Sequence, residues 1–427
     1  MSPFDNGRAV LTGDGTRSGA ALSASPSPSL ASSGIGDDTI RRCGDTLRPQ
    51  DPGRVLDGPT FAVALSGGGF RAMLSALGVL RFLADAGLLR DVRFVSSASG
   101  GSVTNGMLAT RWTRLRERGF STPALDELVV GPLVDSVAGS SLKWELVRHA
   151  WRTAGPATRT ELLAEALDRR FFAGALLEDL DPACRYIINA ANLGTGVRFA
   201  FERDVVGDYV LGLAPTAGTG LRVATAVAAS AAVPGTFPPL RLPGIAFPCA
   251  DARRTPILAD GGAYDNTGLE ALDKDRYQDV FLVALNAGGI FIPGPLDRVP
   301  VAGELKRANS LLYRQSTALR TRWMVERFHS WNDLSAGGRP SSARRGVLFG
   351  LAAEMRSPAA DRWRRRFPEH RSWNGRDLAL FPTVFDRLDS RLCRLLIYRG
   401  WWLTGAAFAT FHPELADLAA IEDSPPL

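Results

Sequence analysis

The chain has 427 residues, of which 45% are hydrophobic and 22% charged, and its formal net charge is +6. This composition is that of an ordinary globular protein with a large core, and the mild basic excess does not choose between a membrane and a nucleic acid as partner. The N-terminus lacks the features of a signal peptide, and no apolar run reaches the roughly 18 residues of a membrane-spanning helix. Four widely spaced cysteines without a C-x-x-C pair argue against a zinc site. We therefore expect a cytoplasmic protein.

The first elements alternate between strands and helices. Residues 1–57 are rich in Ser, Gly, Pro and Asp, which predicts a disordered tail. FAVAL (61–65) is an apolar run typical of a buried strand, and the apolar residues of AMLSALGVLRFLADAGLL recur at helical spacing. VRFVS then predicts a second strand, and a second helix begins near SVTNG. This alternation predicts a parallel α/β sheet.

The same sheet is expected to resume after a helical insertion at 120–182. Buried strands are predicted at 184–191, 197–202, 256–260 and 279–287, and a helix of small residues at 225–233 ends at Pro234. We expect a core at 58–290 and a mostly helical C-terminal region at 291–427 that packs on it.

The stretch SSASGGS places Ser99 directly after the second strand and before a helix. A nucleophile elbow needs this position, with small residues two before and two after the serine, because the turn is strained. Ser97 and Gly101 satisfy that condition, with Gly100 between serine and glycine, although G-x-S-x-G would have glycine where Ser97 stands. The other interpretation is a Ser/Gly-rich loop without a chemical role.

A glycine loop, SGGGFR, follows the first strand in the same way. Gly67, Gly68 and Gly69 allow backbone N–H groups to converge, so the loop could hold a phosphate, form an oxyanion hole, or serve only as a turn. A dinucleotide site is disfavoured because Ala72 occupies the last glycine position of G-x-G-x-x-G.

With two later stretches, these motifs resemble the patatin-like phospholipase family over about residues 58–290. The later stretches are AASAAVPGTFPPL (228–240) and ADGGAYDNTGLEAL (259–272), in the order in which the family has them. SGGGFRAM is also similar to the glycine loop of animal cytosolic phospholipases. The resemblance implies a three-layer α/β/α fold with a mostly parallel central sheet, and a lipid acyl hydrolase of phospholipase or lysophospholipase type. No calcium-binding loop is apparent in the sequence, so we expect no metal, and we expect no cofactor.

The resemblance also implies a role for each motif residue. Ser99 would be the nucleophile and Asp260 its base, in a Ser–Asp dyad without histidine. The supporting positions are the oxyanion-hole residues Gly67, Gly68 and Gly69 with Arg71 beside them, the elbow residues Ser97, Gly100 and Gly101, and the aspartate-motif residues Gly261 and Gly262.

Two alternatives stay open. By itself, Asp260 in Asp-Gly-Gly is equally a turn residue, and His329, His370 or His412 follows it in the order that a histidine-dependent esterase requires. The chain could also be a catalytically silent lipid-binding or scaffold protein with the same fold.

The expected partner is a lipid or phospholipid substrate, and no nucleic acid is expected. Residues 361–367 (DRWRRRF) and the pair Trp401–Trp402 mix cations with aromatic rings, which suits peripheral contact with a membrane surface. The other interpretation of such a run is a solvated helix face.

Overall fold

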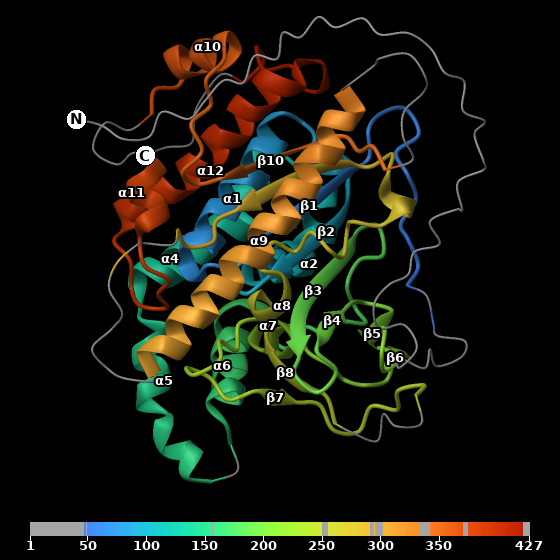
Figure 1. Ribbon diagram of the computed structural model, residues 1–427, viewed down its shortest axis with the longest axis vertical. Coiled ribbons are helices and arrows are strands. Elements are labelled where there is room, and N and C mark those ends of the chain that lie inside the picture. The colour runs from blue at the N-terminus through green and yellow to red at the C-terminus, as the bar shows by residue number, and fades with distance from the viewer. Residues whose placement is uncertain are drawn as a thin grey trace, which may run out of the picture. The chain divides into compact units, whose positions relative to one another are not determined.

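The computed structural model describes residues 47, 49–155, 157–249, 255–290, 294, 302–332, 342–369 and 375–421, and is drawn in Figure 1. A ten-stranded sheet in the order β10-β9-β1-β2-β3-β4-β5-β6 organises this part of the chain, with β8 paired to β3 and β7 to β8. The strands are β1 Phe61–Leu65, β2 Val92–Ala98, β3 Arg185–Asn192, β4 Val197–Phe201, β5 Val205–Asp208, β6 Gly212–Pro215, β7 Leu240–Arg241, β8 Ile257–Asp260, β9 Phe281–Asn286 and β10 Gly346–Gly350. The predicted tail at 1–57 falls largely outside the described residues.

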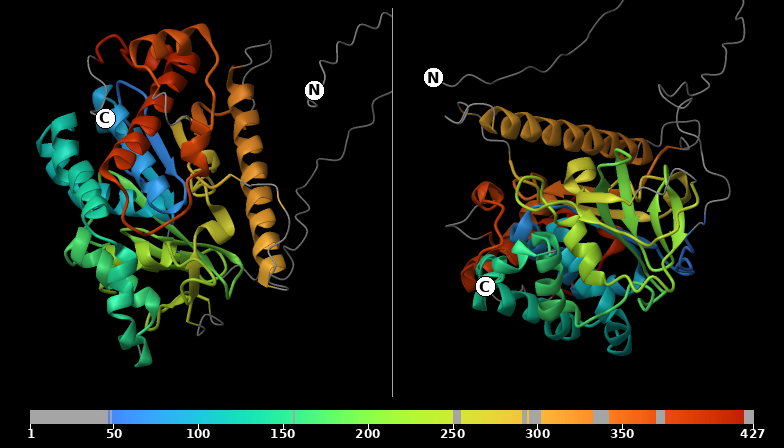
Figure 2. Two further views of the ribbon diagram at one scale, coloured as in Figure 1. Left: turned by 90° about the vertical axis from the view of Figure 1, so that its left-hand side faces the viewer. Right: turned by 90° about the horizontal axis from the view of Figure 1, so that it is seen from below.

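Helices cover both faces of the sheet. They are α1 Gly69–Asp85, α2 Gly100–Glu117, α3 Thr122–Leu125, α4 Gly131–Gly139, α5 Leu142–Arg148, α6 Arg159–Leu167, α7 Val223–Ser230, α8 Gly262–Asp265, α9 Ala302–Asn332, α10 Pro358–Arg366, α11 Gly375–Leu380 and α12 Ser390–Phe411. Short helical turns include η2 Asp126–Val130, η3 Ala150–Ala154 and η4 Asp168–Phe172. Figure 2 shows α9 on one side of the sheet and most other helices on the opposite side.

The alternation of side chains along β1 explains these layers. Phe61, Val63 and Leu65 join the core cluster that includes α1, α2 and α12, whereas Ala62 and Ala64 join the cluster that includes α9. Successive side chains of a strand point to opposite faces, so a strand with both faces covered is apolar throughout. The α/β/α fold with a central parallel sheet, expected from the sequence, is confirmed: β10, β9, β1, β2 and β3 pair in parallel.

The pairing on β3 brings two distant chain segments end to end. β2 pairs in parallel with the first part of β3, up to Ala98 opposite Asn189. β8 pairs antiparallel with the last part, where Asp260 lies opposite Ala190. β4 pairs along one edge of β3, with residues that also pair with β2 or with β8. β2 and β8 therefore both lie along the opposite edge of β3. The ends of β2 and β8 therefore meet at neighbouring positions.

The sheet extends beyond the elements expected from the sequence. β5 and β6 continue the expected strand β4 as an antiparallel extension, and β10, from the region expected to be mostly helical, lies parallel to β9 at the other end. From α3 to η4, residues 122–172 are mainly helical. Helix α12 packs along α1, where a Cβ on Gly400 would lie 2.0 Å from the carbonyl oxygen of Ser75. The C-terminal region is thus part of the core.

The aromatic residues of the two segments that suggested membrane contact are buried. Trp401 and Trp402 are at most 1% exposed, and Trp363 and Phe367 are also in the core cluster. The indole of Trp363 donates to the carbonyl of Trp402, and the indole of Trp402 donates to that of Phe367. The interfacial interpretation of these segments is therefore wrong, because their rings pack α10 against α12. None of the described helices has the length and apolarity needed to cross a membrane.

Candidate active site

Ser99 stands alone between β2 and α2 in a strained backbone conformation. Its φ is 48° and its ψ −122°, a region that L-residues rarely adopt, and its side chain is 4% exposed. A Cβ on Gly100 would lie 2.1 Å from the carbonyl oxygen of Gly69, and one on Gly101 would lie 2.6 Å from that of Leu65. The two glycines are required because the glycine loop packs directly against this turn.

Buried hydroxyl groups hold the turn in place. The amide of Ser99 donates to Oγ of Ser230, and the hydroxyl of Ser230 donates to the carbonyl of Asn189. Ser102 Oγ lies 2.9 Å from Ser230 Oγ and 3.0 Å from Ser97 Oγ. Ser97, which replaces the usual glycine, is therefore a hydrogen-bonded member of this network and is compatible with the turn.

Asp260 ends β8 and is 5% exposed. Its amide donates to the carbonyl of Ala232, just after α7, and its Oδ1 accepts the amide of Gly262 at 2.6 Å. Oδ2 is buried and has no hydrogen-bond partner among the described residues. Burial raises the pKa of Asp260 to about 6, although the Ser99 side chain and the Gly262 amide each lower it by hydrogen bonding. Ser99 and the carboxylate of Asp260 are therefore neighbours in the site.

The glycine loop supplies unused amides next to Ser99. Gly67 is committed, because its amide donates to the carbonyl of Asn266 at 2.9 Å. Gly68 and Gly69 have φ of 144° and 61°, and among the described residues their amides donate to no acceptor. A Cβ on Gly67 would lie 2.9 Å from Cβ of Ser99, so the loop and the serine are in direct contact. Of the three predicted oxyanion donors, two are available.

Arg71 lies behind this loop and is 1% exposed. Nε donates to the carbonyl of Ala287 at 3.0 Å and Nη1 donates to that of Phe381, while Nη2 has no partner among the described residues. A Cβ on Gly68 would lie 3.2 Å from Nη2. Burial lowers the pKa of Arg71 from its usual value. Arg71 therefore ties the loop to two other segments and places a positive group behind Gly68.

Ser99 and Asp260 line one cavity of about 740 Å³. Helix α9 forms much of its wall, and Tyr313 from this helix accepts a hydrogen bond from Nδ2 of Asn266. The cavity is lined by Gly68, Ser99, Val233, Pro234, Asp260, Gly262, Ala263, Asn266, Gly289, Ile290, Arg307, Asn309, Ser310, Leu312, Tyr313, Arg314, Gln315, Ser316, Leu319 and Thr383.

Two contributors to this site were not assigned roles in it from the sequence. Asn266 bonds the glycine loop through both its backbone carbonyl and its side chain, and the D-N pair after the aspartate motif was the only signal for it. Tyr313 lies in the middle of a long helix whose sequence carries no motif. Burial raises the pKa of Tyr313 to about 12, so its hydroxyl stays protonated.

The described histidines lie elsewhere. His329 is exposed on α9, His412 packs on Phe281 at 4.8 Å between ring centroids, and His149 lines a different cavity. His370 lies outside the described residues. No described histidine therefore lines the cavity of Ser99. In the described part of the chain, no group of three or more His, Cys, Asp or Glu side chains could hold a metal ion.

Solved structures similar to this chain include two kinds of protein. Human GIVD cytosolic phospholipase A2, in complex with methyl gamma-linolenyl fluorophosphonate, aligns with a TM-score of 0.46 and 14% identity, over 84% of this chain and 59% of that one. VipD from Legionella pneumophila aligns with a TM-score of 0.31 and 17% identity, over 79% of this chain and 70% of that one.

Sequence comparison finds a relative and a family. Lysophospholipase 3 of Saccharomyces cerevisiae is 29% identical over 128 residues, which are 26% of this chain and only 19% of that protein. The family model described as patatin-like phospholipase matches residues 63–273, which hold the glycine loop, the elbow and the aspartate motif. Through the domain formed by these residues, the chain belongs to the patatin-like phospholipase family.

Proposed function

We propose that this chain is a serine hydrolase that cleaves carboxylic esters of lipids of the phospholipid or lysophospholipid class, with Ser99 as nucleophile and Asp260 as its base. One observation carries the proposal. A serine in a strained strand-to-helix turn shares a cavity with a buried carboxylate that has a pKa of about 6 and no cationic partner among the described residues.

The pKa of Asp260 suits it to act as a general base. An exposed aspartate is mostly ionised but too weakly basic, whereas one with a pKa near 6 is both ionised at neutral pH and a better proton acceptor. As Oγ of Ser99 attacks the ester carbonyl, its proton passes to Oδ2 of Asp260, the oxygen that has no other partner among the described residues. Collapse of the tetrahedral intermediate expels the alcohol, which takes this proton. Water then cleaves the acyl–serine ester in the same way.

The amides of Gly68 and Gly69 are the proposed oxyanion donors. Aligned N–H groups stabilise the negative charge that develops on the carbonyl oxygen, and preorganised donors do so without reorganisation cost. Gly67 is left out of this role because its amide is bound to Asn266. Arg71, whose Nη2 lies behind Gly68, would add a positive potential at the same place.

The cavity lining supports an amphiphilic substrate. Leu312, Leu319 and Ile290 provide apolar surface for an acyl chain, and Arg307 and Arg314 provide positive charge for an anionic head group. The family and the yeast lysophospholipase agree with this class. This chain spans only a small part of the yeast lysophospholipase. We therefore base the proposed substrate class of this chain on the residues that line its cavity.

The test is covalent labelling with a fluorescent fluorophosphonate, which reports an activated serine without knowledge of the substrate. We expect the purified chain to be labelled at Ser99, Ser99→Ala to lose labelling, and Asp260→Asn to label about 10²- to 10⁴-fold more slowly because the base is missing. Peptide mapping identifies the labelled residue.

Two control variants separate the alternatives. Ser140→Ala, at an exposed serine outside the Ser99 cavity, should label like the unaltered chain. His329→Ala should do the same, whereas a histidine-dependent esterase that uses His329 predicts its inactivity. Labelling at another serine would refute the assignment of Ser99, and absence of labelling with retained lipid binding would favour the catalytically silent protein.

A further inference from the structure

The segment from α5 to η3 (residues 142–154, called the α5–η3 segment) exposes large apolar side chains away from the Ser99 cavity. Trp144, Val147 and Trp151 are 63%, 52% and 74% exposed. Trp144 and Val147 are three residues apart in α5 and so share one side of that helix, and Trp151 follows in η3. In Figure 1 this segment projects at the lower edge of the described part of the chain. Two exposed tryptophans so close together are unusual on a protein that stays in water.

Basic residues accompany these tryptophans. Between residues 142 and 154 the sequence has Lys143, Arg148 and Arg152 against one acid, Glu145, and Arg152 is ion-paired with Glu165. Glu145 is neutralised by ion pairs with Arg169 and Arg170 at 2.7 Å each. The side chain of Arg148 makes no ion pair with any described residue, so its charge is available to an external anion.

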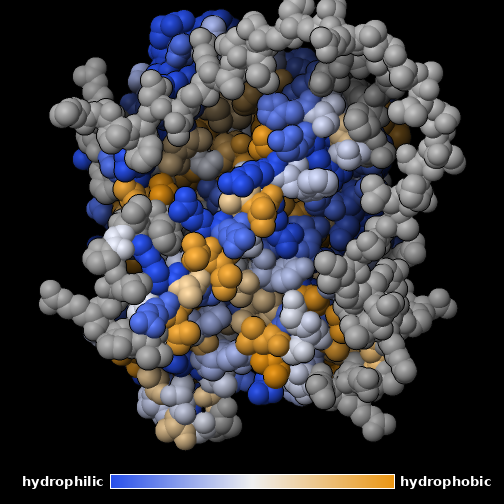
Figure 3. All heavy atoms as spheres, in the orientation of Figure 1, coloured by the Kyte–Doolittle hydropathy of each residue, from blue (hydrophilic) through white to orange (hydrophobic). Residues whose placement is uncertain are grey.

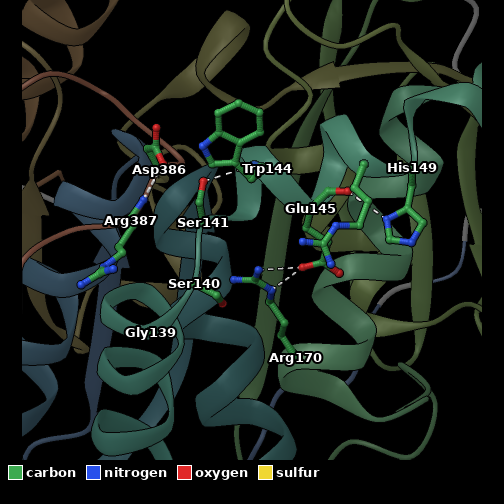
Figure 4. A pocket seen from close by; sticks show the side chains of 10 residues that line it. Gly139, Ser140, Ser141, Trp144, Glu145, His149, Arg170, Asp386 and Arg387 are labelled. Carbon is green, nitrogen blue, oxygen red and sulfur yellow. Dashed lines mark hydrogen bonds and ion pairs between the residues drawn. The ribbon is translucent and has the colours of Figure 1, made fainter.

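A second cavity of about 800 Å³ lies beside Trp144. Figure 4 shows Asp386 and Arg387 on one side of it, Trp144 and Ser141 above, and Glu145, His149 and Arg170 on the other side. Its charged lining is Arg148, Arg170 and Arg387 against Glu145 and Asp386. The three arginines of this lining outnumber its two acids, and Arg169, outside the lining, is also ion-paired with Glu145, so the surroundings of this cavity are net positive.

The loop of residues 381–389 connects this cavity to that of Ser99. Thr383 lines the Ser99 cavity, and Arg387 lines the second one. Four residues of extended chain span at most about 14 Å, so the two linings are close neighbours. The loop contacts both sides: the carbonyl of Val384 accepts the amide of Phe70 next to the glycine loop, and the carbonyl of Phe385 accepts the amide of Lys143.

We propose that the α5–η3 segment docks on a lipid bilayer that contains anionic lipid, with Trp144 and Trp151 inserted at the interface and Arg148 and Arg387 facing the head groups. Tryptophan rings prefer the boundary between head groups and acyl chains, and arginine binds phosphate. The proposal rests on the proposed lipid hydrolase function, because docking at this segment would hold the nearby Ser99 cavity at the surface that supplies its substrate.

Helix α9 is the competing surface. It also exposes apolar side chains, among them Leu305 and Trp323, and Figure 3 shows hydrophobic residues over it in small groups separated by hydrophilic ones. Leu312 and Leu319 of this helix line the Ser99 cavity. We assign Leu312 and Leu319 to the substrate path, since the α5–η3 segment combines two exposed tryptophans, an arginine without an ion pair among the described residues, and a cavity of its own.

The experiment is sedimentation of the full chain with vesicles, using Ser99→Ala so that hydrolysis cannot alter the lipid. Vesicles are phosphatidylcholine alone or mixed with phosphatidylglycerol. We expect binding to the anionic vesicles that weakens at high salt. The double variant Trp144→Ala/Trp151→Ala should bind at least about tenfold less to them. Arg148→Glu/Arg387→Glu should lose the preference for phosphatidylglycerol. The matched control Trp323→Ala removes a tryptophan of α9 that is 56% exposed, and this variant should bind normally.

Three other results would contradict membrane docking by the α5–η3 segment. Normal vesicle binding by Trp144→Ala/Trp151→Ala, or loss of binding by Trp323→Ala alone, would overturn the proposal. A change of oligomeric state in the double variant, with vesicle binding unchanged, would assign the segment to self-association instead. The double variant with Ser99 intact should keep its fluorophosphonate labelling. Failure of docking and failure of the proposed chemistry are thus measured separately.

Discussion

At the scale of single residues, Asp260 is the unusual group of this protein. Most buried carboxylates are paired with a cation, but the carboxylate of Asp260 contacts an amide and the Ser99 side chain, and its Oδ2 has no partner among the described residues. Burial therefore destabilises the ionised form and raises its pKa to about 6. The same desolvation that destabilises the ionised carboxylate also makes it a stronger base, which suits the proposed role of Asp260.

The cost predicts a pH-dependent stability. The pKa of Asp260 is higher in the folded chain, about 6, than its ordinary value of 3.8, so folding favours the protonated form. Its contribution to stability is complete at pH below the ordinary value and is lost as the pH rises through about 6. The variant Asp260→Asn has no ionisable group here and so does not lose this stability. Between low and neutral pH, its free energy of unfolding should rise by on the order of 2–3 kcal/mol relative to that of the unaltered chain. Urea unfolding of both chains below pH 3.8 and above pH 6 measures this, and a difference that does not change with pH would contradict it.

At the scale of elements, the contact between α1 and α12 positions the glycine loop. Helix α1 begins at Gly69, so any shift of the helix moves the proposed oxyanion donors. A Cβ on Gly78 would lie 2.0 Å from the carbonyl oxygen of Ile397 and 2.5 Å from the amide nitrogen of Trp401. The backbones of the two helices approach each other where each has a glycine, Gly78 on one and Gly400 on the other.

Substitution of Gly78 by alanine should therefore damage both stability and site. The new methyl group meets backbone atoms that cannot rotate away, and such overpacking costs about 1–3 kcal/mol. Urea unfolding should show this loss, and fluorophosphonate labelling at Ser99 should slow because α1 carries Gly69. Gly139→Ala is the control, because a Cβ at that helical glycine meets nothing within 4 Å. Equal stability of the two variants would mean that the helices separate without cost.

At the scale of the whole molecule, the residues after 290 are needed to complete the core. The family model matches residues 63–273, but β10 pairs along β9, and Trp401, Trp402 and Phe408 of α12 are fully or almost fully buried. Without them, one edge of the sheet and the outer face of α1 would meet water.

A chain that ends at residue 290 should therefore not fold cooperatively. We expect it to be poorly soluble and to lack a sharp thermal transition by circular dichroism, whereas the full chain has one. In the full chain, Trp401→Ala should cost about 3–5 kcal/mol, because it leaves a large cavity between α1, α10 and α12. A cooperative transition of the shortened chain, with labelling at Ser99, would show instead that the family domain folds alone.

Local patterns in the sequence predicted the motifs of the site. The runs FAVAL (61–65) and VRFVS (92–96) became β1 and most of β2, and β1 is apolar throughout because both of its faces are buried. The turn at Ser99 was predictable because small residues around a serine at a strand end permit the strained backbone. The short strands β5, β6 and β7 and strand β10 were not predicted, because short runs carry little periodicity of their own.

What the sequence by itself determined was the order of strands, turns and helices that carry Ser99, the glycine loop and Asp260, because each depends on neighbouring residues. Only the tertiary structure decided that Asp260 meets Ser99, since β2 and β8 share an edge of β3 through pairings between residues far apart in the chain. It also decided which tryptophans are exposed: Trp401 and Trp402 are buried, whereas Trp144 and Trp151 face solvent. Both segments combine tryptophan with arginine, and exposure depends on which surfaces the rest of the chain covers.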